Sequence, residues 1–120
     1  MSTVELVLNE NSFTGTIPTT IGLIPDLTYL ELSNNELSGT IPKIFFRLEN
    51  LEVAYLSNNT LSGTISSDFG KLSQLTDLYL DGNEFSGTVP DFDFSQNEAP
   101  QYSECFSIID LLLFYYHDLY

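Results

Sequence analysis

Hydrophobic and polar positions recur every 24 residues over most of the chain. The clearest apolar column consists of leucines, and it contains Leu8, Leu32, Leu56 and Leu80. Five further columns keep this spacing. The polar and glycine columns are Asn11, Asn35, Asn59 and Asn83; Gly15, Gly39, Gly63 and Gly87; and Thr16, Thr40, Thr64 and Thr88. The branched aliphatic column is Ile17, Ile41, Ile65 and Val89, and the proline column has three members, Pro18, Pro42 and Pro90. Self-similarity at one fixed period is the signature of a repeat architecture. We therefore expect a repeat domain of four coils over residues 3–92.

Within one repeat, apolar residues alternate with other types over a short stretch. The copy at residues 27–48 reads LTYLELSNNELSGTIPKIFFRL. Leu30 and Leu32 occupy alternate positions, which is the pattern of a half-buried strand, and the side chains between and beside them are expected to point outward: Tyr29, Glu31 and Ser33. One such coil cannot bury its leucines alone, whereas stacked coils bury them against each other beside a short parallel sheet. The pattern predicts an α/β repeat solenoid.

The polar and conformationally special residues predict how each coil turns. Every asparagine of the repeating column follows a strand, and its side chain offers a donor and an acceptor to backbone groups of its own and neighbouring coils. We therefore expect a structural asparagine ladder that contains Asn11, Asn35, Asn59 and Asn83. Glycine suits a bend or a close approach of the backbone, and the proline after the aliphatic residue suits an extended connector.

The remainder of each repeat is expected to complete the core. The segment Ser67 to Leu75 predicts a 3-10 turn or a short helical piece on the side opposite the strands. Four leucines of this part are expected to point inward: Leu48, Leu51, Leu72 and Leu75. A further column of large apolar residues predicts a buried spine: Phe13, Leu37, Leu61 and Phe85.

The best copy resembles a known family of repeats. Five residues fit the pattern L-x-x-L-x-L-x-x-N-x-L of leucine-rich repeats: Leu27, Leu30, Leu32, Asn35 and Leu37. The segment that follows, residues 38–42 with the sequence SGTIP, resembles the L-x-G-x-I-P signature of the plant-specific subfamily. The resemblance covers about residues 3–92. It implies a right-handed superhelix with a short parallel sheet on the concave face and 3-10 turns and loops on the convex side.

The same resemblance implies a function and a location. The plant-specific subfamily builds the ectodomains of receptor kinases, receptor-like proteins and secreted wall-protein inhibitors. We therefore expect a non-catalytic module that binds a protein or a peptide, as part of a larger receptor-like protein at the cell surface or outside the cell. Two alternatives remain: the repeat part of a receptor kinase, and a surface or ice-binding solenoid whose regular hydroxyl row contains Thr16, Thr40, Thr64 and Thr88.

Charge narrows the choice of partners. The 120 residues include 17 Asp and Glu but three Lys and Arg, which gives a net charge of −14. Such a surface repels nucleic acid and anionic lipid and favours a basic partner.

The first residues contain no recognisable signal peptide, and no apolar run reaches the roughly 18–20 residues that a membrane span needs.

Candidate catalytic and metal-binding residues are scarce. His117 is the one histidine, and a Ser-His-Asp arrangement would depend on it. Cys105 is the one cysteine, so it forms no disulfide within the chain, and together with His117 it is too little for a structural zinc site. We therefore expect no enzyme activity, no metal and no cofactor.

The binding residues are expected on the concave strand positions that the repeat pattern leaves free. Three outward columns have these positions: Glu5, Tyr29, Val53 and Asp77; Val7, Glu31, Tyr55 and Tyr79; Asn9, Ser33, Ser57 and Asp81. Tyrosine is enriched in interfaces because it combines a large rigid contact with a polar tip. The predicted partner-binding residues are Tyr29, Glu31, Val53, Tyr55, Asp77, Tyr79 and Asp81. The alternative is that tyrosine and valine merely suit exposed strand positions.

Asn58 begins the sequence Asn58-Asn59-Thr60, which is an N-glycosylation motif. Because it precedes a ladder asparagine, its side chain is expected to point outward and to be accessible. The alternative is coincidence in a repeat that is rich in Asn and Thr.

The repeat pattern fails beyond Phe92, and residues 93–120 form a non-repeat tail with the aromatic and aliphatic run SIIDLLLFYYHDLY. Three interpretations remain for this tail: a cap helix over the last coil, non-native sequence from a splice or frame error, or a shortened membrane-proximal piece.

At the N-terminal end, the strand pattern begins almost at Met1 without a preceding polar cap, although the ends of a solenoid core need covers. Paired cap cysteines are also missing. We therefore expect a fragment of a longer protein or an incomplete gene model.

Overall fold

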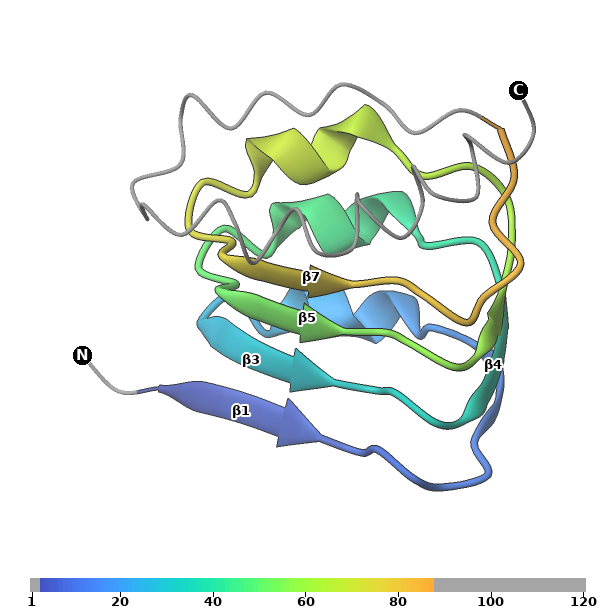
Figure 1. Cartoon of the computed structure of the whole chain (residues 1–120). Helices are drawn as coiled ribbons and strands as arrows, with labels where there is room; N and C mark the ends of the chain where they lie inside the picture. The colour runs from blue at the N-terminus through green and yellow to red at the C-terminus, as the bar shows by residue number, and fades with distance from the viewer. Residues whose placement is uncertain (1–2, 88–120) are drawn as a thin grey trace.

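A computed structural model describes residues 3–87, which form stacked coils (Figure 1). Each coil contributes a strand to one side and, in most coils, a second short strand and a 3-10 helix. The elements in chain order are β1 (Val4–Val7), β2 (Thr14–Thr16), η1 (Thr19–Leu23), β3 (Leu27–Glu31), β4 (Glu36–Gly39), η2 (Lys43–Arg47), β5 (Val53–Tyr55), β6 (Thr60–Leu61), η3 (Ser67–Lys71) and β7 (Asp77–Tyr79).

The predicted parallel sheet is confirmed. Its strand order is β1-β3-β5-β7, and every neighbouring pair is parallel. Residues 24 positions apart lie opposite each other, as Tyr29 lies opposite Val53 and Val53 opposite Asp77. The repeat period therefore equals one full coil, and each sequence column becomes a line of side chains that crosses the sheet.

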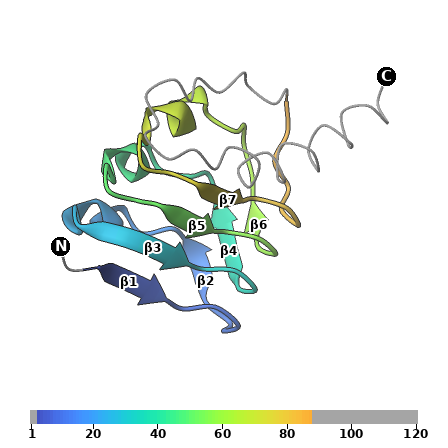
Figure 2. The ribbon, with the colours of Figure 1, turned by 60° about the vertical axis from the view of Figure 1, so that its left-hand side comes forward.

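A second parallel sheet was not expected from the sequence. Strands β2, β4 and β6 pair in that order beside the first sheet (Figure 2), and a bridge between Thr64 and Ser86 continues the pairing into the next coil. The sequence predicted a bend or a close approach of neighbouring coils at the glycines of these strands, and an extended connector at the proline that follows. Stacking brings the connectors of successive coils side by side, and their backbone N–H and C=O groups then satisfy each other.

The 3-10 helices lie across the core from the four-stranded sheet, as predicted for the segment from residue 67 onward (Figure 1). Pro18 and Pro42 precede η1 and η2 with extended backbones. Ser66 replaces the proline before η3, and its hydroxyl accepts a hydrogen bond from the Asp68 N–H at 3.0 Å. The exception in the proline column is therefore a side-chain helix cap.

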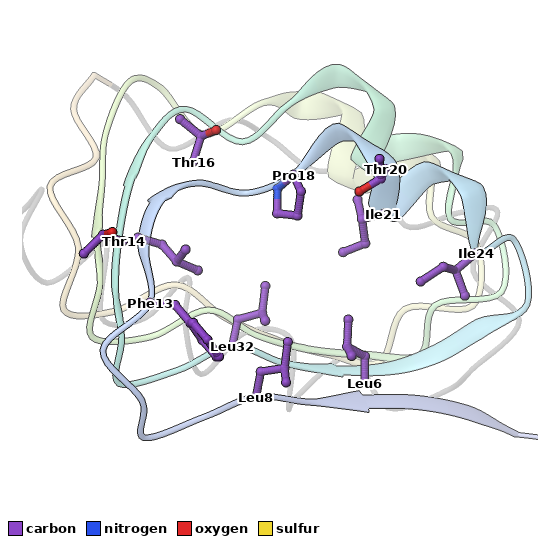
Figure 3. A pocket seen from close by; sticks show the side chains of 11 residues that line it. Leu6, Leu8, Phe13, Thr14, Thr16, Pro18, Thr20, Ile21, Ile24 and Leu32 are labelled. Atoms are coloured by element: carbon purple, nitrogen blue, oxygen red, sulfur yellow. The ribbon is translucent and has the colours of Figure 1, made fainter.

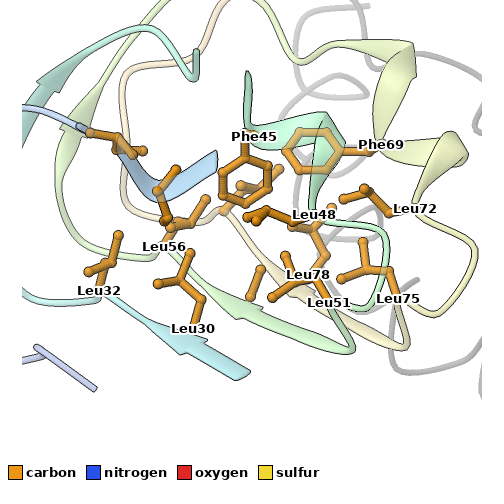
Figure 4. Packing of buried hydrophobic residues seen from close by; sticks show 14 of the residues in the cluster. Leu30, Leu32, Phe45, Leu48, Leu51, Leu56, Phe69, Leu72, Leu75 and Leu78 are labelled. Carbon is orange, nitrogen blue, oxygen red and sulfur yellow. The ribbon is translucent and has the colours of Figure 1, made fainter. Parts of the chain in front are cut away.

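The core lies between the four-stranded sheet and the 3-10 helices (Figure 4). Phe45 and Phe69 are fully buried, with ring centroids 5.9 Å apart in an edge-on arrangement. The four leucines predicted to point inward are all buried: Leu48, Leu51, Leu72 and Leu75. Stacking of like coils thus forms one continuous apolar interior, as expected for a repeat protein.

The predicted apolar spine is only partly correct. Leu37 and Leu61 are 5% and 0% exposed, but Phe13 is 46% exposed and Phe85 is half-buried. The two leucines lie in middle coils with a neighbour on each side, whereas Phe13 lies in the first described coil. Burial at this column therefore depends on having a coil on both sides.

Asn59 shows what the repeating asparagine does. Its amide nitrogen lies 3.0 Å from the carbonyl oxygen of Leu32 in the preceding coil, and 3.3 and 3.2 Å from those of Leu56 and Ser57 in its own coil. Its side-chain oxygen accepts a hydrogen bond from the Leu37 N–H at 3.0 Å. One side chain thus satisfies backbone groups of two coils at the strand ends.

The other asparagines of this column differ according to their place in the stack. Asn35 and Asn83 make the same four contacts, displaced by one coil in each direction. Asn11 is exposed, and it donates to the carbonyls of Leu8 and Asn9 in its own coil. The middle asparagines therefore join coils, and Asn11 joins residues of one coil.

We expect Asn35→Ala to lower the free energy of unfolding by about 1–3 kcal/mol, because it leaves buried backbone groups without a partner. Asn11→Ala is the matched control and should change stability by no more than about 0.5 kcal/mol, because that site is exposed. Chemical denaturation of both variants and the parent chain measures the difference. Equal losses in the two variants would contradict the ladder.

Candidate binding face

The exposed face of the four-stranded sheet carries two lines of side chains that the strand register aligns. The first line is Glu5, Tyr29, Val53 and Asp77, and the second is Val7, Glu31, Tyr55 and Tyr79. The residues on β3, β5 and β7 in these lines are all half-buried. The adjacent strand residues that alternate with them are in the core, as Leu30, Ala54 and Leu78 show. The structure therefore brings the predicted binding residues onto one face.

Three tyrosines on this face are in contact, and we call them the tyrosine strip: Tyr29, Tyr55 and Tyr79. The rings of Tyr55 and Tyr79 are stacked, with centroids 4.6 Å apart and an interplanar angle of 15°. The ring of Tyr29 lies 5.8 Å from that of Tyr55 at 58°. Since neighbouring strands are about 4.7–4.9 Å apart, tyrosines on adjacent strands stack at nearly the strand spacing. The strip is a continuous aromatic surface across three coils.

Two of the four residues in the third outward column are buried, which the sequence did not predict. Ser33 and Ser57 are each only 8% exposed. The Ser33 hydroxyl and N–H donate to the carboxylate of Glu31, the N–H at 2.9 Å, and the Ser57 hydroxyl donates to Asp81 at 2.5 Å. Both serines are therefore buried and hydrogen-bonded to a carboxylate. Their role on this face is to orient Glu31 and Asp81.

The tyrosine strip lies in an acidic and partly dehydrated environment. Burial raises the pKa of Tyr29 above its ordinary value of 10.0, and the nearby charge of Glu31 raises it further. Burial also raises the pKa of Tyr55, with smaller contributions from Tyr79, Tyr29 and Asp77. The neutral phenol is therefore favoured in the folded chain, and both hydroxyls are hydrogen-bond donors at neutral pH.

Positive charge is absent from the strands of this face. All three basic residues of the chain lie on 3-10 helices: Lys43 and Arg47 at the two ends of η2, and Lys71 at the end of η3. Lys71 pairs with Asp68 of the same helix at 2.9 Å. Since the helices lie across the core from the sheet, the carboxylates beside the tyrosine strip have no basic side chain of this chain on their own strands.

The structure contains a column of left-handed residues that was not predicted from the sequence. Glu10, Asn34, Asn58 and Gly82 all have positive φ angles, between 56° and 70°. Asn and Gly tolerate this conformation better than other residues do, so their spacing of 24 could have revealed the turn. The Asn58 amide donates to the side-chain oxygen of Asn34 at 3.1 Å. A Cβ on Gly82 would lie 2.2 Å from the Asn58 side-chain oxygen, so a larger residue at this position would displace the Asn58 side chain.

Glycosylation of Asn58 stays a prediction. The residue is exposed, as the sequence suggested, but its amide nitrogen is already engaged with Asn34. A glycan on that nitrogen would leave one hydrogen atom for the bond to Asn34. Modification is therefore compatible with the exposed position, and it would alter the polar column beside the sheet.

The second sheet presents a different surface. Thr16, Thr40 and Thr64 are exposed in successive coils. A Cβ on Gly39 would lie 2.9 Å from the methyl carbon of Thr16, and one on Gly63 would lie 2.8 Å from that of Thr40. Each threonine methyl group therefore packs over the glycine of the next coil. This contact explains why both columns repeat together.

Residues 3–87 contain no group of three or more His, Cys, Asp or Glu residues arranged to hold a metal ion. No helix of those residues is both long and apolar enough to cross a bilayer. Cys105, His117, Thr88, Pro90 and the predicted tail of residues 93–120 lie outside the described residues.

Comparisons with known proteins agree with the repeat architecture. A leucine rich repeat family model matches residues 25–85, and a second leucine rich repeat model matches residues 74–97. A comparison with curated proteins finds no match.

Solved structures with similar folds include plant receptors. A pollen receptor kinase 3 is 34% identical, with a TM-score of 0.71, and the match covers 78% of this chain and 44% of that one. The Arabidopsis receptor kinase HAESA, solved with the peptide hormone IDA and the co-receptor SERK1, is 42% identical with a TM-score of 0.66, over 68% of this chain and 14% of that one. A plant ice-binding protein is 35% identical with a TM-score of 0.66, over 68% of this chain and 26% of that one. The chain spans less than half of each.

We expect Glu31→Gln to lower the pKa of Tyr29 toward 10.0, because it removes the charge that adds to burial. The ring resonances of Tyr29, followed by NMR across alkaline pH, measure this change. Because the folded pKa is raised, the associated stability is complete below pH 10.0 and is lost as pH rises through the folded pKa. Glu49→Gln removes an exposed carboxylate after η2 and is the control. An identical Tyr29 titration in the Glu31→Gln and Glu49→Gln variants would contradict the assignment.

Proposed function

Because this chain belongs to the leucine-rich-repeat family, we propose that it is a non-catalytic binding module whose exposed sheet face contacts a protein or a peptide. The tyrosine strip is the observation that carries this proposal. The Tyr55 ring contacts both Tyr29 and Tyr79, and all three side chains are half-buried, so little side-chain freedom remains to be lost on binding. Aromatic residues of this kind supply much of the affinity in protein interfaces.

The partner that fits this face has basic character. Glu31 and Asp81 are oriented by serines, and Asp77 lies on the same face. Lysine and arginine side chains bind carboxylates through charge-assisted hydrogen bonds and also lie favourably over tyrosine rings. An extended segment with basic side chains can use both interactions along the strip. The acidic charge of the chain would also accelerate its encounter with such a partner.

Similarity to receptor ectodomains supports the same class of function. HAESA is described in complex with a peptide hormone and a co-receptor, so a fold of this kind is compatible with both partner types. We propose that the chain is the repeat part of a larger receptor-like protein that is exposed outside the cell. A kinase in the same polypeptide is the alternative form of this proposal, and the coding sequence that flanks these residues would decide between them.

Binding of an arginine-rich synthetic peptide tests the proposal. We expect such a peptide to bind more tightly than its glutamate counterpart, and its affinity to fall as salt is added. Tyr55→Ala and Tyr79→Ala should each weaken binding about tenfold, which corresponds to about 1.4 kcal/mol. Fluorescence anisotropy of labelled peptides measures these affinities.

Matched carboxylate variants make this experiment specific. Glu31→Gln and Glu49→Gln change the net charge equally, but only Glu31 lies beside the tyrosine strip. We expect Glu31→Gln to weaken binding clearly more than Glu49→Gln. Unchanged affinity in both tyrosine variants, or equal effects of the two glutamine variants, would exclude the strip as the binding surface.

Ice binding is the second candidate function, and the exposed threonines of the second sheet favour it. Thr16, Thr40 and Thr64 are exposed in successive coils beside the second sheet. The methyl group of each threonine packs against a glycine of the next coil, which restrains the threonine side chain. One of the similar structures is described as an ice-binding protein.

Thermal hysteresis measurements test this second function. If the threonine row binds ice, the chain should show hysteresis that Thr40→Lys largely abolishes, because a long charged side chain interrupts the row. Tyr55→Ala lies on the other sheet and should leave the hysteresis unchanged. The absence of hysteresis in the parent chain would remove this candidate without affecting the peptide-binding proposal.

A further inference from the structure

The Glu31 carboxylate is held by only one of its two oxygens. Both the hydroxyl and the N–H of Ser33 donate to Oε1, the N–H at 2.9 Å. Each carboxylate oxygen has two lone pairs, so these two donors occupy both acceptor positions of Oε1. Among the described residues, no donor reaches Oε2. Glu31 therefore presents one open oxygen to a partner rather than two.

This carboxylate lies beside the tyrosine strip. In the register of β3 and β5, Glu31 is opposite Tyr55. Tyr29 precedes it by two residues on β3, and alternate residues of a strand point to the same face. Burial, and after it the charge of Glu31, raises the pKa of Tyr29, which agrees with a short separation between the carboxylate and that ring. A cation that reaches Oε2 therefore also lies next to an aromatic side chain.

Ser57 holds a different carboxylate in a different way. It occupies the position of Ser33 in the next coil and is equally buried, with 8% of its surface exposed. The residue two positions before it is a tyrosine rather than a glutamate. Its hydroxyl donates instead to Oδ1 of Asp81 in the following coil at 2.5 Å. Within residues 3–87 this is the one donor to Asp81, so both oxygens of that carboxylate keep an acceptor position.

The number of open oxygens distinguishes the two basic side chains that a partner can offer. A guanidinium binds a carboxylate most strongly through two parallel N–H···O bonds, one to each oxygen. Glu31 cannot accept this fork without losing a bond from Ser33, because Oε1 already accepts two donors. An ammonium is a compact charge with three rotatable donors, and it needs only Oε2. The methylene chain of a lysine can then lie along the neighbouring tyrosine.

The ring arrangement does not compensate arginine for this loss. Its planar guanidinium also gains affinity by stacking on an open aromatic face. Tyr55 and Tyr79 cover one face of each other at a centroid distance of 4.6 Å, which leaves no room for a planar group between them. Tyr29 is tilted by 58° to Tyr55, so that pair forms no parallel slot either.

We propose that Ser33 makes the Glu31 position selective for an ammonium group, and that a lysine side chain of the partner binds there. This inference rests on the proposed function, in which the tyrosine strip binds a basic protein or peptide, and it adds which basic side chain is recognised at one position. Ser33 acts through Glu31 and is a positioning residue. Its hydroxyl fills the acceptor position that the second arm of an arginine fork requires.

Hexalysine and hexaarginine peptides test this selectivity. Both carry blocked ends, so that lysine side chains supply the only ammonium groups. Fluorescence anisotropy with the full chain gives the two affinities, and the measured quantity is their ratio. Ser33→Ala opens one acceptor position of Oε1, so the arginine peptide should gain on the lysine peptide by about threefold to tenfold.

Two further variants separate selectivity from a merely structural role of the serine. Ser57→Ala removes an equally buried serine that also binds a carboxylate, and it should leave the ratio unchanged. Glu31→Gln should weaken the binding of both peptides. In the Glu31→Gln chain, Ser33→Ala should no longer change the ratio, because the serine acts only through that carboxylate. Thermal unfolding of each variant shows that it is folded.

The outcomes distinguish this inference from the proposed function. If both peptides bind the parent chain and Ser33→Ala leaves their ratio unchanged, the selectivity is overturned and the binding function stands. Equal shifts of the ratio in Ser33→Ala and Ser57→Ala would overturn the selectivity as well, because only Ser33 saturates an oxygen of its carboxylate. If neither peptide binds the parent chain, the proposed function and this inference are both overturned.

Discussion

Backbone carbonyl groups at the ends of the strands must find donors inside the stack, and one asparagine amide supplies them in each middle coil. Asn59 contacts carbonyls of two successive coils and also accepts an N–H from the earlier one. A buried backbone group without a partner costs about 1–3 kcal/mol. Because the same side chain serves both coils, a coil shifted along its neighbour would lose these bonds. The asparagine column therefore holds the coils in a register of 24 residues.

This register brings residues that are 24 positions apart in the sequence side by side on the surface of the four-stranded sheet. In the four-stranded sheet it places Tyr55 beside Tyr79 at 4.6 Å. In the second sheet the register is displaced, with Thr16 opposite Ser38, and each threonine methyl group lies over a glycine of the next coil. The leucines of the same strands face the core, so residues on the outer face are free of the packing requirement. An aromatic and acidic face on one sheet and a hydroxyl row on the other can then exist on the same small scaffold.

Charge is distributed to match these surfaces. All three basic residues are on the 3-10 helices, and Glu31 and Asp81 on the sheet side are held by Ser33 and Ser57. Binding energy for a partner would come mainly from the rings, while the carboxylates would select and orient basic groups. The first coil differs from both faces, because mainly apolar side chains line a cavity there (Figure 3).

The sequence by itself determined the coil length, the leucine-bearing strands, the 3-10 segments and the lines of residues across the sheet, because these follow from a strict period and from local alternation. It also predicted that Tyr29, Tyr55 and Tyr79 share one face. Only the tertiary structure decided that the connectors pair as a second sheet, that Ser33 and Ser57 are covered, and that Phe13 is exposed while Leu37 is not. The reason is that such features depend on what lies beside each coil. A repeating sequence specifies the coil, whereas burial and hydrogen-bond partners depend on the neighbours that the stack provides.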